Sequence, residues 1–554
     1  MNAPATHRAG APVHVTKEAS VPASRWGERG VAMITVMLLG MVLTLVLVAA
    51  MGFVVNSQPL ARRDQDWNAA LEAAQAGAED YRYRLQQDDN YYPKTSPYRW
   101  SSTNAPTPTN PAISGWQPVP GPTSEAKFHY DVDATQFGSQ GMLVVVSSGR
   151  VRNVTRTVRV TLRRRNFLDY LYLTDYESLD PQSGYYSDPN QAQTDCAKYW
   201  WQGRDDDDCV RISFVTGDQI NGPLHTNDTI SVNGSPRFND DATTGWTGRM
   251  SCPSSSSYTY RWYGLSGCAD TPVFQSGDPR SAAILALPTS NTALKTQTDP
   301  SIGNTGCLFT GPTRITLKDG GASGLMDVVS PLTPAGGNCQ PGLNRPLPAN
   351  GVVYVQNVPS PPSITCRLAT NAVGYPISGD DTDYNTCDGD AFVSGTLRGQ
   401  LTIASEHNVV VVGDTTYATG TAGTDLLGLV ANQFVQVYHP VNSSGTNLSD
   451  SRLPRVPFTN PVIHAALLAI GHSFIVQNYN RGAQLGTLTV SGAIAQKWRG
   501  PVGTSGGSGT GYLKSYNYDG RLAFAAPPHA LDLSDAAFEV KVWAEIRNPT
   551  GLPV

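Results

Sequence analysis

The sequence predicts an α+β N-terminal part, in which a long helix lies on an antiparallel sheet, followed by a mainly-β domain built as a parallel β-helix or a related solenoid. Three observations predict this architecture. An uncharged stretch, Val31–Val55, is long enough for a membrane-spanning helix. Strands with alternating apolar residues follow between residues 127 and 163. From about Asn166 onward, short apolar runs alternate with turns rich in Gly, Asn and Asp.

The composition is typical of short elements joined by many turns. The 554 residues include 53 glycines and 40 prolines, and only 15 % are charged. A net charge of −5 and a pI near 6.0 provide no basic field for phosphates, so nucleic-acid binding is not expected.

The apolar stretch predicts one membrane span. No charged side chain lies between Arg29 and Arg62, and Val31–Val55 would form a helix about 37 Å long, against a hydrocarbon core of about 30 Å. A cleavable signal peptide is the alternative, but its apolar region would be shorter and would end at a small-residue cleavage site. Basic residues flank both ends of the span, so their count favours a cytoplasmic N-terminus only slightly.

The cysteines predict disulfides in an oxidising compartment, which places the C-terminal bulk outside the membrane. Many connectivities are open, and pairing between sequence neighbours is the simplest. Zinc ligation is the alternative, although it favours closer C-x₂₋₄-C pairs. The eight residues are Cys196, Cys209, Cys252, Cys268, Cys307, Cys339, Cys366 and Cys387.

The residues at the start of the apolar stretch resemble the cleavage region of type IV prepilins. Glu28–Gly30 followed by Val31–Thr35 is similar to that region in PilX-type minor pilins and pseudopilins, and the resemblance covers roughly the first 165 residues. It implies that a cytoplasmic peptidase cuts after Gly30, so that the mature chain begins at Val31. It also implies that the helix enters a fibre with other pilin-like subunits and their assembly machinery.

Two positions depart from the pattern of that family. The first mature residue would be Val31 where pilins usually carry Phe, and the fifth is Thr35 where most carry Glu. Some pseudopilins at fibre tips also lack this Glu, so the resemblance implies a minor or initiating subunit rather than a bulk one. A plain N-terminal anchor with an accidental glycine at position 30 is the alternative.

A helical stripe and three strands follow the span. Pro59 predicts a kink or an interruption of the helix. Strands are expected at 127–132, 141–148 and 151–163, with a turn at Ser148–Arg150. A helix on an antiparallel sheet is the architecture that the resemblance implies, and the periodicities independently agree with it; a coiled-coil stalk is the alternative for the stripe. The stripe consists of Trp67, Leu71, Ala74, Ala78, Tyr81 and Leu85.

The domain boundaries follow from these patterns. We expect a cytoplasmic leader at 1–30, the transmembrane helix at 31–55, the helix and sheet at 56–165 and an extracytoplasmic β-rich domain at 166–554. A β-sandwich is the alternative for the last domain. The alternating residues Phe538–Ala544 predict a last strand that closes it.

Candidate chemistry is sparse. Asp381, Asp383 and Asn385 supply oxygens at positions 1, 3 and 5 of a calcium loop, but Thr386 and Phe392 exclude an EF-hand, which leaves an irregular calcium site. No other metal site and no catalytic residue can be named, and no histidine has ligand-type partners at metal spacing in the sequence.

The sequence therefore predicts a structural subunit of a type IV filament system rather than an enzyme. Its outer domain would serve adhesion or assembly, and the aromatic clusters at 199–201 and 258–263 offer planar contacts for a surface glycan or a protein, unless they pack in the core. A surface hydrolase or lyase acting on polysaccharide is one alternative, because paired carboxylates on a β-helix suit that chemistry. A surface anchor that never enters a fibre is the other.

Overall fold

The computed structural model describes most of the chain after residue 30. The backbone is described for residues 31–121, 125–137, 141–164, 166–205, 208–252, 255–360, 365–366, 373–450, 457–504, 509–533, 538–549 and 552, and side chains at these positions except 31, 54–61, 252 and 255–258. Two compact units divide it, Met1–Asn68 and Ala69–Val554.

One long helix, α1 (Val31–Gln87), begins the described chain. Its segment Ala32–Phe53 has a mean hydropathy of 2.7 and is long and apolar enough to cross a membrane. The helix continues through Pro59, so an interruption there is wrong, whereas the alternative, a kink, stays a prediction. A proline removes one backbone donor, and the residues on both sides keep the remaining helical bonds.

The second half of α1 packs on an antiparallel sheet, as the periodicities predict. Ala74, Ala78, Tyr81 and Leu85 are buried in a core shared with this sheet, whereas Trp67 is 50 % exposed and lies outside the packed face. The sheet has the order β1-β3-β4-β5-β33, with β2 paired to β3. These strands are β1 (Arg99–Trp100), β2 (Gln117–Pro118), β3 (Lys127–Asp133), β4 (Met142–Val151), β5 (Val154–Arg164) and β33 (Phe538–Ile546).

Gly149 allows α1 to approach the sheet closely. A Cβ on this glycine would lie 2.1 Å from the carbonyl oxygen of Ala70 and 2.2 Å from the amide nitrogen of Ala74. The predicted turn at Ser148–Arg150 is therefore wrong, because Gly149 lies within β4 and the hairpin turns at Arg152, whose φ is 51°. The sequence pattern reads this glycine as a turn residue, but the helix requires it.

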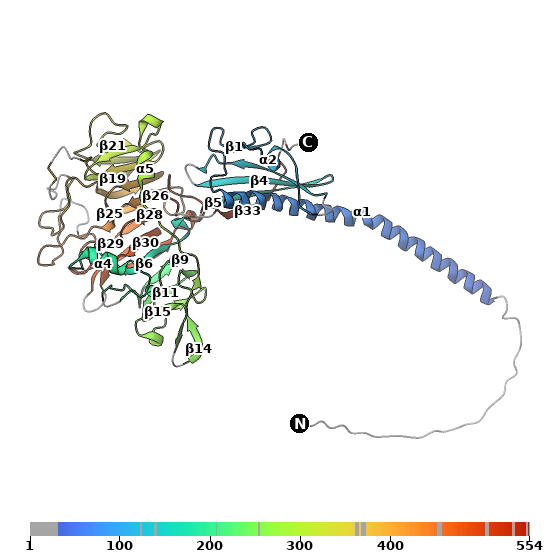
Figure 1. The fold of residues 1–554 in the computed structure, drawn as a ribbon, viewed down its shortest axis with the longest axis horizontal. Coiled ribbons are helices and arrows are strands. Elements are labelled where there is room, and N and C mark those ends of the chain that lie inside the picture. The colour runs from blue at the N-terminus through green and yellow to red at the C-terminus, as the bar shows by residue number, and fades with distance from the viewer. Residues whose placement is uncertain are drawn as a thin grey trace, which may run out of the picture. The chain divides into compact units, whose positions relative to one another are not determined.

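The last strand belongs to this sheet rather than to the C-terminal domain. β33 pairs antiparallel with β5, from Phe538 opposite Arg164 to Ile546 opposite Thr157, with a bulge between Val540 and Val542 (Figure 1). The expectation that this strand closes the β-rich domain is wrong, and so is the single C-terminal segment 166–554. The β-rich domain is instead an insertion between two neighbouring strands.

Both ends of this insertion are fixed by the same charged side chain. Asp169, in the short 3-10 turn Phe167–Asp169 that follows β5, forms ion pairs with Arg163 of β5 and with Lys541 of β33, the latter at 2.7 Å. Arg163 is fully buried and also donates to the carbonyl oxygen of Leu522 at 2.7 Å. The chain therefore leaves the sheet and returns to it at one place.

The inserted domain consists of short strands that pair mainly in parallel. The longest ladder runs β18-β22-β24-β26-β28-β30-β6-β9-β12-β17, and every pair in it is parallel. Its strands are β18 (Cys307–Thr310), β22 (Val352–Gln356), β24 (Gln400–Ser405), β26 (Leu426–Ala431), β28 (Val462–Ala469), β30 (Gln484–Arg499), β6 (Tyr172–Leu179), β9 (Leu224–Thr226), β12 (Ala242–Thr244) and β17 (Arg280–Ser281).

Further parallel ladders complete the domain. One contains β19 (Thr313–Asp319), β23 (Ala391–Leu397), β25 (Val409–Tyr417), β27 (Val435–Val437) and β29 (Phe474–Val476). Another continues from β30 through β32 (Thr510–Tyr518), β8 (Gln219–Asn221), β11 (Arg237–Phe238) and β16 (Val273–Phe274). A small sheet contains β7 (Phe214–Val215), β10 (Ile230–Asn233) and β15 (Trp262–Gly264).

Antiparallel hairpins and short helices decorate these ladders. The hairpin strands are β13 (Met250–Cys252), β14 (Ser255–Tyr260), β20 (Gly324–Val329), β21 (Gly342–Pro346) and β31 (Gly503–Thr504). The short helices of the inserted domain are α4 (Pro189–Cys196) and α5 (Thr292–Thr296) among the described residues, whereas α2 (Pro111–Ser114) packs in the core between α1 and the first sheet.

The order of the long ladder shows an unusual chain path. The chain begins at β6, proceeds through β9 and β12 to β17 at one end, and then resumes at β18 at the opposite end. It returns strand by strand to β30, which pairs with β6. The first and the last strand of the ladder are therefore neighbours in its middle.

Buried apolar residues at matching positions of successive strands stack along the ladder and form the core. Ile403, Leu429, Leu467 and Ile494 occupy matching positions on four successive strands, and all are fully buried. Each of these short strands buries too little apolar surface to be stable alone, but stacking makes the core continuous. The opposite face of the ladder is covered as well, in part by Leu522 and Leu294, which explains the uninterrupted apolar run of β26.

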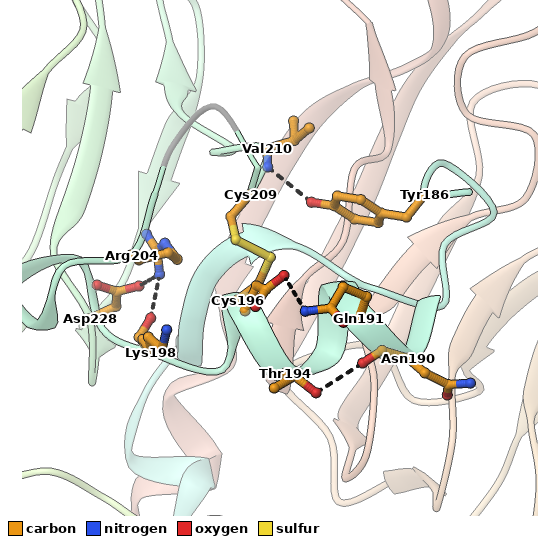
Figure 2. Close-up of a disulfide and its surroundings, with 11 residues drawn as sticks. Tyr186, Asn190, Gln191, Thr194, Cys196, Lys198, Arg204, Cys209, Val210 and Asp228 are labelled. Carbon is orange, nitrogen blue, oxygen red and sulfur yellow. Dashed lines mark hydrogen bonds and ion pairs between the residues drawn. A yellow bond between two sulfur atoms is a disulfide. The ribbon is translucent and has the colours of Figure 1, made fainter. Parts of the chain in front are cut away.

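Three disulfides link sequence neighbours: Cys196–Cys209, Cys307–Cys339 and Cys366–Cys387. Cys268 is also disulfide-bonded, while the side chain of Cys252, its expected partner, lies outside those described. Figure 2 shows the first bridge, which joins the end of α4 to Cys209. Beside it, Arg204 forms a buried ion pair with Asp228 and donates to the carbonyl oxygen of Lys198.

A second buried ion pair lies where β6 meets β30. Glu177 of β6 and Arg499 of β30 are 2.5 Å apart and almost fully buried. Burial raises the pKa of Glu177, an effect that the charge of Arg499 opposes. The guanidinium also lies over the ring of Phe214, 3.6 Å from its centroid. The contact between β6 and β30 therefore contains an ion pair whose two members are buried together.

We expect Gly149→Ala to lower the free energy of unfolding by about 1–3 kcal/mol, because the methyl group would overlap backbone atoms of α1 that cannot rotate away. Urea unfolding of the full chain in detergent would measure the loss. Gly520→Ala is the matched control, since a Cβ there meets nothing within 4 Å. Equal stability of the two variants would contradict the close packing.

We expect Glu177→Leu to cost about 3–5 kcal/mol of folding free energy, because it leaves Arg499 buried without its partner. The double variant Glu177→Leu/Arg499→Leu should lose less than the sum of the two single variants. Arg398→Leu serves as the control, because its pair with Asp319 is partly exposed and should contribute little to stability. Additive losses in the double-mutant cycle would show that the pair is not coupled.

Candidate functional site

A polar cleft of about 600 Å³ lies on the inserted domain. Four aspartates line it, and Arg481 is the only Lys or Arg among its described lining residues. Arg481 is already paired with Asp381 at 2.7 Å. The cleft therefore carries an excess of negative charge, contributed by Asp383, Asp388 and Asp390.

The parallel register brings two distant segments together in this cleft. Asp390 directly precedes β23, and His407 and Asn408 directly precede β25. Ala391 of β23 lies opposite Val409 of β25, so the residues before these strands also lie side by side. The backbone amide of Ala391 donates to the carbonyl oxygen of Asn408 at 2.9 Å, which fixes this alignment.

Asp388, Asp390 and His407 form a compact cluster. Each offers one ligand-type atom, and these atoms all lie within 4.8 Å of one another. Nδ1 of His407 is 2.7 Å from Oδ1 of Asp390, and Nε2 is 3.7 Å from Oδ2 of Asp388. His407 and Asp388 are partly exposed, whereas the side chain of Asp390 is 1 % exposed. One member of the cluster, Asp390, is therefore buried, and the other two can be reached from the cleft.

The hydrogen bonds of Asp390 are uneven. Its Oδ1 atom accepts from the backbone amide of Asn408 at 3.1 Å and faces His407. Its Oδ2 atom is buried and has no hydrogen-bond partner among the residues that the structure describes. A buried carboxylate oxygen without a partner is costly, so this atom needs an explanation.

The electrostatics of the cluster favour a proton or a cation. Burial lowers the pKa of His407, but the hydrogen bond and the charge of Asp390 outweigh this effect, and the pKa is raised above its usual value. Burial raises the pKa of Asp388, which the charge of His407 opposes. Positive charge is therefore stabilised between these carboxylates.

The predicted calcium residues line the same cleft. Oδ2 of Asp381 accepts from Arg481, and Oδ1 of Asn385 accepts from the backbone amide of Cys387 at 3.0 Å in a local turn. Asp383 lies between them in sequence and also lines the cleft. Calcium binding by these three residues stays a prediction, and it would compete with the contact between Asp381 and Arg481.

The predicted processing and assembly positions lie on α1. Gly30 and the side chain of Val31 lie outside the described residues. The hydroxyl of Thr35 donates to the carbonyl oxygen of Ala32 at 3.0 Å within the helix. Such a local bond is common for threonine in helices and provides no charge at this position.

Several of the predicted glycan-contacting aromatics pack inside the domain. Tyr260 and Trp262 are buried in the main core with ring centroids 4.0 Å apart. Tyr199 stacks between Tyr176 and Trp201. The side chain of Tyr258 lies outside those described. Core packing thus explains Tyr260 and Trp262.

Sequence reasoning missed His407. Asp390 and His407 are 17 residues apart, a spacing that matches no linear metal pattern. The signal that identifies the histidine is the parallel register of β23 and β25, which places the residue before β25 beside the residue before β23. That register is known only from the structure.

Comparisons with known proteins add little. No protein-family model matches the chain, and no curated protein matches it. Among solved structures, the chain is similar to the competence-associated pilin ComZ from Thermus thermophilus, with 12 % identity, 87 % of this chain and 97 % of that chain covered, and a TM-score of 0.26. With so low a TM-score, the likeness carries no argument about this chain.

We expect Cys366→Ser/Cys387→Ser to loosen the wall of the cleft, because the bridge closes a segment of 21 residues that ends beside Asp388. Loss of such a bridge costs about 3 kcal/mol. Hydrogen exchange should accelerate at residues 373–390 and not in β24 or β26. Cys307→Ser/Cys339→Ser is the control and should leave exchange at 373–390 unchanged; unaltered exchange in the first variant would show that the bridge does not hold the cleft.

Proposed function

We propose that this chain is a pilin-like minor subunit of a type IV filament or pseudopilus, anchored by α1 and displaying the inserted domain outside the membrane. One observation carries this proposal: a single helix combines an apolar membrane-length segment with a second half buried on an antiparallel sheet. A simple anchor does not need one unbroken helix that joins the membrane segment to the packed segment. A subunit whose helix must pass from a bilayer into a fibre needs such a helix.

The helix is suited to close packing with other helices. Its membrane-length segment presents large apolar side chains all round, such as Met37, Leu43 and Phe53, with no charge among them. Thr35 satisfies its own hydroxyl and leaves no acidic group there. The missing charge supports a specialised subunit present in few copies rather than the bulk of a fibre.

We further propose that the inserted domain is a parallel β-helix. Its in-register parallel ladders and the stacked column Ile403, Leu429, Leu467 and Ile494 support this description better than a β-sandwich, which would consist of antiparallel sheets. A solenoid offers a long exposed surface for a glycan or protein ligand. Because the domain is inserted between β5 and β33, the core between α1 and the sheet stays intact. The subunit can therefore display the inserted domain without losing this core.

The cysteines support an extracytoplasmic location for this domain. Three bridges are formed among the described residues and Cys268 is disulfide-bonded as well, and structural disulfides persist in oxidising compartments. The N-terminus would then be cytoplasmic, and the chain a single-pass protein of the cytoplasmic membrane before it joins a fibre.

A second candidate function, cleavage of polysaccharide, draws support from the carboxylates of the cleft. Glycosidases use two carboxyl groups that flank the scissile bond. Asp388 is accessible, but Asp390 is almost fully buried and cannot contact a sugar without rearrangement. We therefore favour the structural role and expect no such activity.

The mature N-terminus tests the proposed function. Mass spectrometry of the protein from its native membrane should find a chain that begins at Val31, because the cut is expected after Gly30. A Gly30→Val variant should keep its leader, whereas a Gly27→Val control should still be cut. An intact Met1, or a cut near Ala50, would overturn the pilin-like assignment.

A further inference from the structure

We propose that Asp388, Asp390 and His407 bind a divalent transition-metal cation of the Zn²⁺ or Mn²⁺ type. The site lies at one corner of the inserted domain, where the segments before β23 and β25 meet. It differs from the predicted calcium residues Asp381, Asp383 and Asn385. The proposal is independent of the filament role, because it concerns only the inserted domain.

The geometry of the cluster suits a small cation. One imidazole and two carboxylates converge, with ligand-type atoms within 4.8 Å of one another. Bond lengths of about 2.0–2.2 Å to a shared ion require ligand atoms roughly 3–4 Å apart. The contact of 3.7 Å between Nε2 of His407 and Oδ2 of Asp388 lies in that range, too long for a hydrogen bond and short enough to share an ion.

The unpartnered oxygen of Asp390 is independent evidence for a ligand. Its Oδ2 atom is buried in the wall of the cleft without a hydrogen-bond donor among the described residues, although Oδ1 has two close neighbours. A metal ion would give this atom the partner that the protein does not provide. It would also offset the excess negative charge of the cleft.

The surroundings of His407 resemble the support that metal-binding histidines usually have. Nδ1 lies 2.7 Å from Oδ1 of Asp390 and 3.0 Å from Nδ2 of Asn408, so polar neighbours hold this side of the ring. Such a carboxylate fixes the tautomer and the orientation of a metal-binding imidazole.

The ligand types select the class of metal. Imidazole suits Zn²⁺ and other transition metals, whereas Ca²⁺ and Mg²⁺ prefer oxygen ligands alone. Thiols, which would compete for Zn²⁺, are not available, since the described cysteines are disulfide-bonded. A mixed site with one nitrogen and two carboxylates therefore favours Zn²⁺ or Mn²⁺ over Ca²⁺.

Calorimetric titration tests this site. The full chain, in detergent with its disulfides intact, is freed of metal with EDTA and titrated separately with Zn²⁺, Mn²⁺ and Ca²⁺. We expect one Zn²⁺ per chain, and affinity at least about 10-fold weaker in His407→Gln and in Asp388→Asn. Asp381→Asn, which removes a carboxylate from the same cleft but not from the cluster, is the matched control and should bind like the parent chain.

Three outcomes would overturn the proposal. They are stoichiometric Ca²⁺ binding without Zn²⁺ or Mn²⁺ binding, loss of binding in Asp381→Asn but not in His407→Gln, and no saturable binding at all. The melting temperatures of the metal-free variants should match that of the parent, which shows that each variant folds.

A measurement on the unsubstituted protein keeps the test decisive if a variant fails to fold. Pulsed electron paramagnetic resonance of bound Mn²⁺ should show coupling to an imidazole nitrogen, because His407 is the only histidine among the described lining residues of the cleft. Bound Mn²⁺ without nitrogen coupling would exclude His407 as a ligand. Neither result depends on processing at Gly30, so this test and that of the filament role can fail separately.

Discussion

The pairing of β6 with β30 is the constraint on which the rest of the inserted domain depends. These are the first and the last strand of the long ladder, and they lie side by side in its middle. The chain therefore leaves and re-enters the domain near one point, where Asp169 holds Arg163 and Lys541 together. A domain larger than the sheet that carries it can then stand between β5 and β33 without separating them.

This closing contact differs chemically from the rest of the core. Along the ladder the interior consists of columns of similar aliphatic side chains, whereas Glu177 and Arg499 are complementary only in one alignment. Lys514 of β32 and Asp218 form a further pair nearby, and burial lowers the pKa of Lys514 while Asp218 opposes the shift. Buried charges cost desolvation energy, and here each is compensated by a partner only in the observed register of the two halves of the domain.

Local patterns predicted the local structure. The stripe Ala74, Ala78, Tyr81 and Leu85 and the strands β3 to β5 follow from periodicities within single segments, and they are present. Partners far apart in sequence were not predictable. An alternating strand such as β33 does not reveal whether it joins β5 or a nearer neighbour, and Gly149 reads as a turn until α1 is placed against it. In each case the local conformation could be predicted from the sequence, but the distant segment against which it packs could not.

The candidate site depends on the same long-range register. Asp390 and His407 meet because β23 and β25 are parallel neighbours whose first residues lie side by side. Polar residues before these two strands therefore lie in one place, although each segment alone shows only scattered acids. Stacking also buries Asp390, which turns an ordinary acidic residue into one whose second oxygen has no donor among the described residues. The register that makes the core continuous thus creates, at its polar corner, an incomplete coordination shell that a cation can fill.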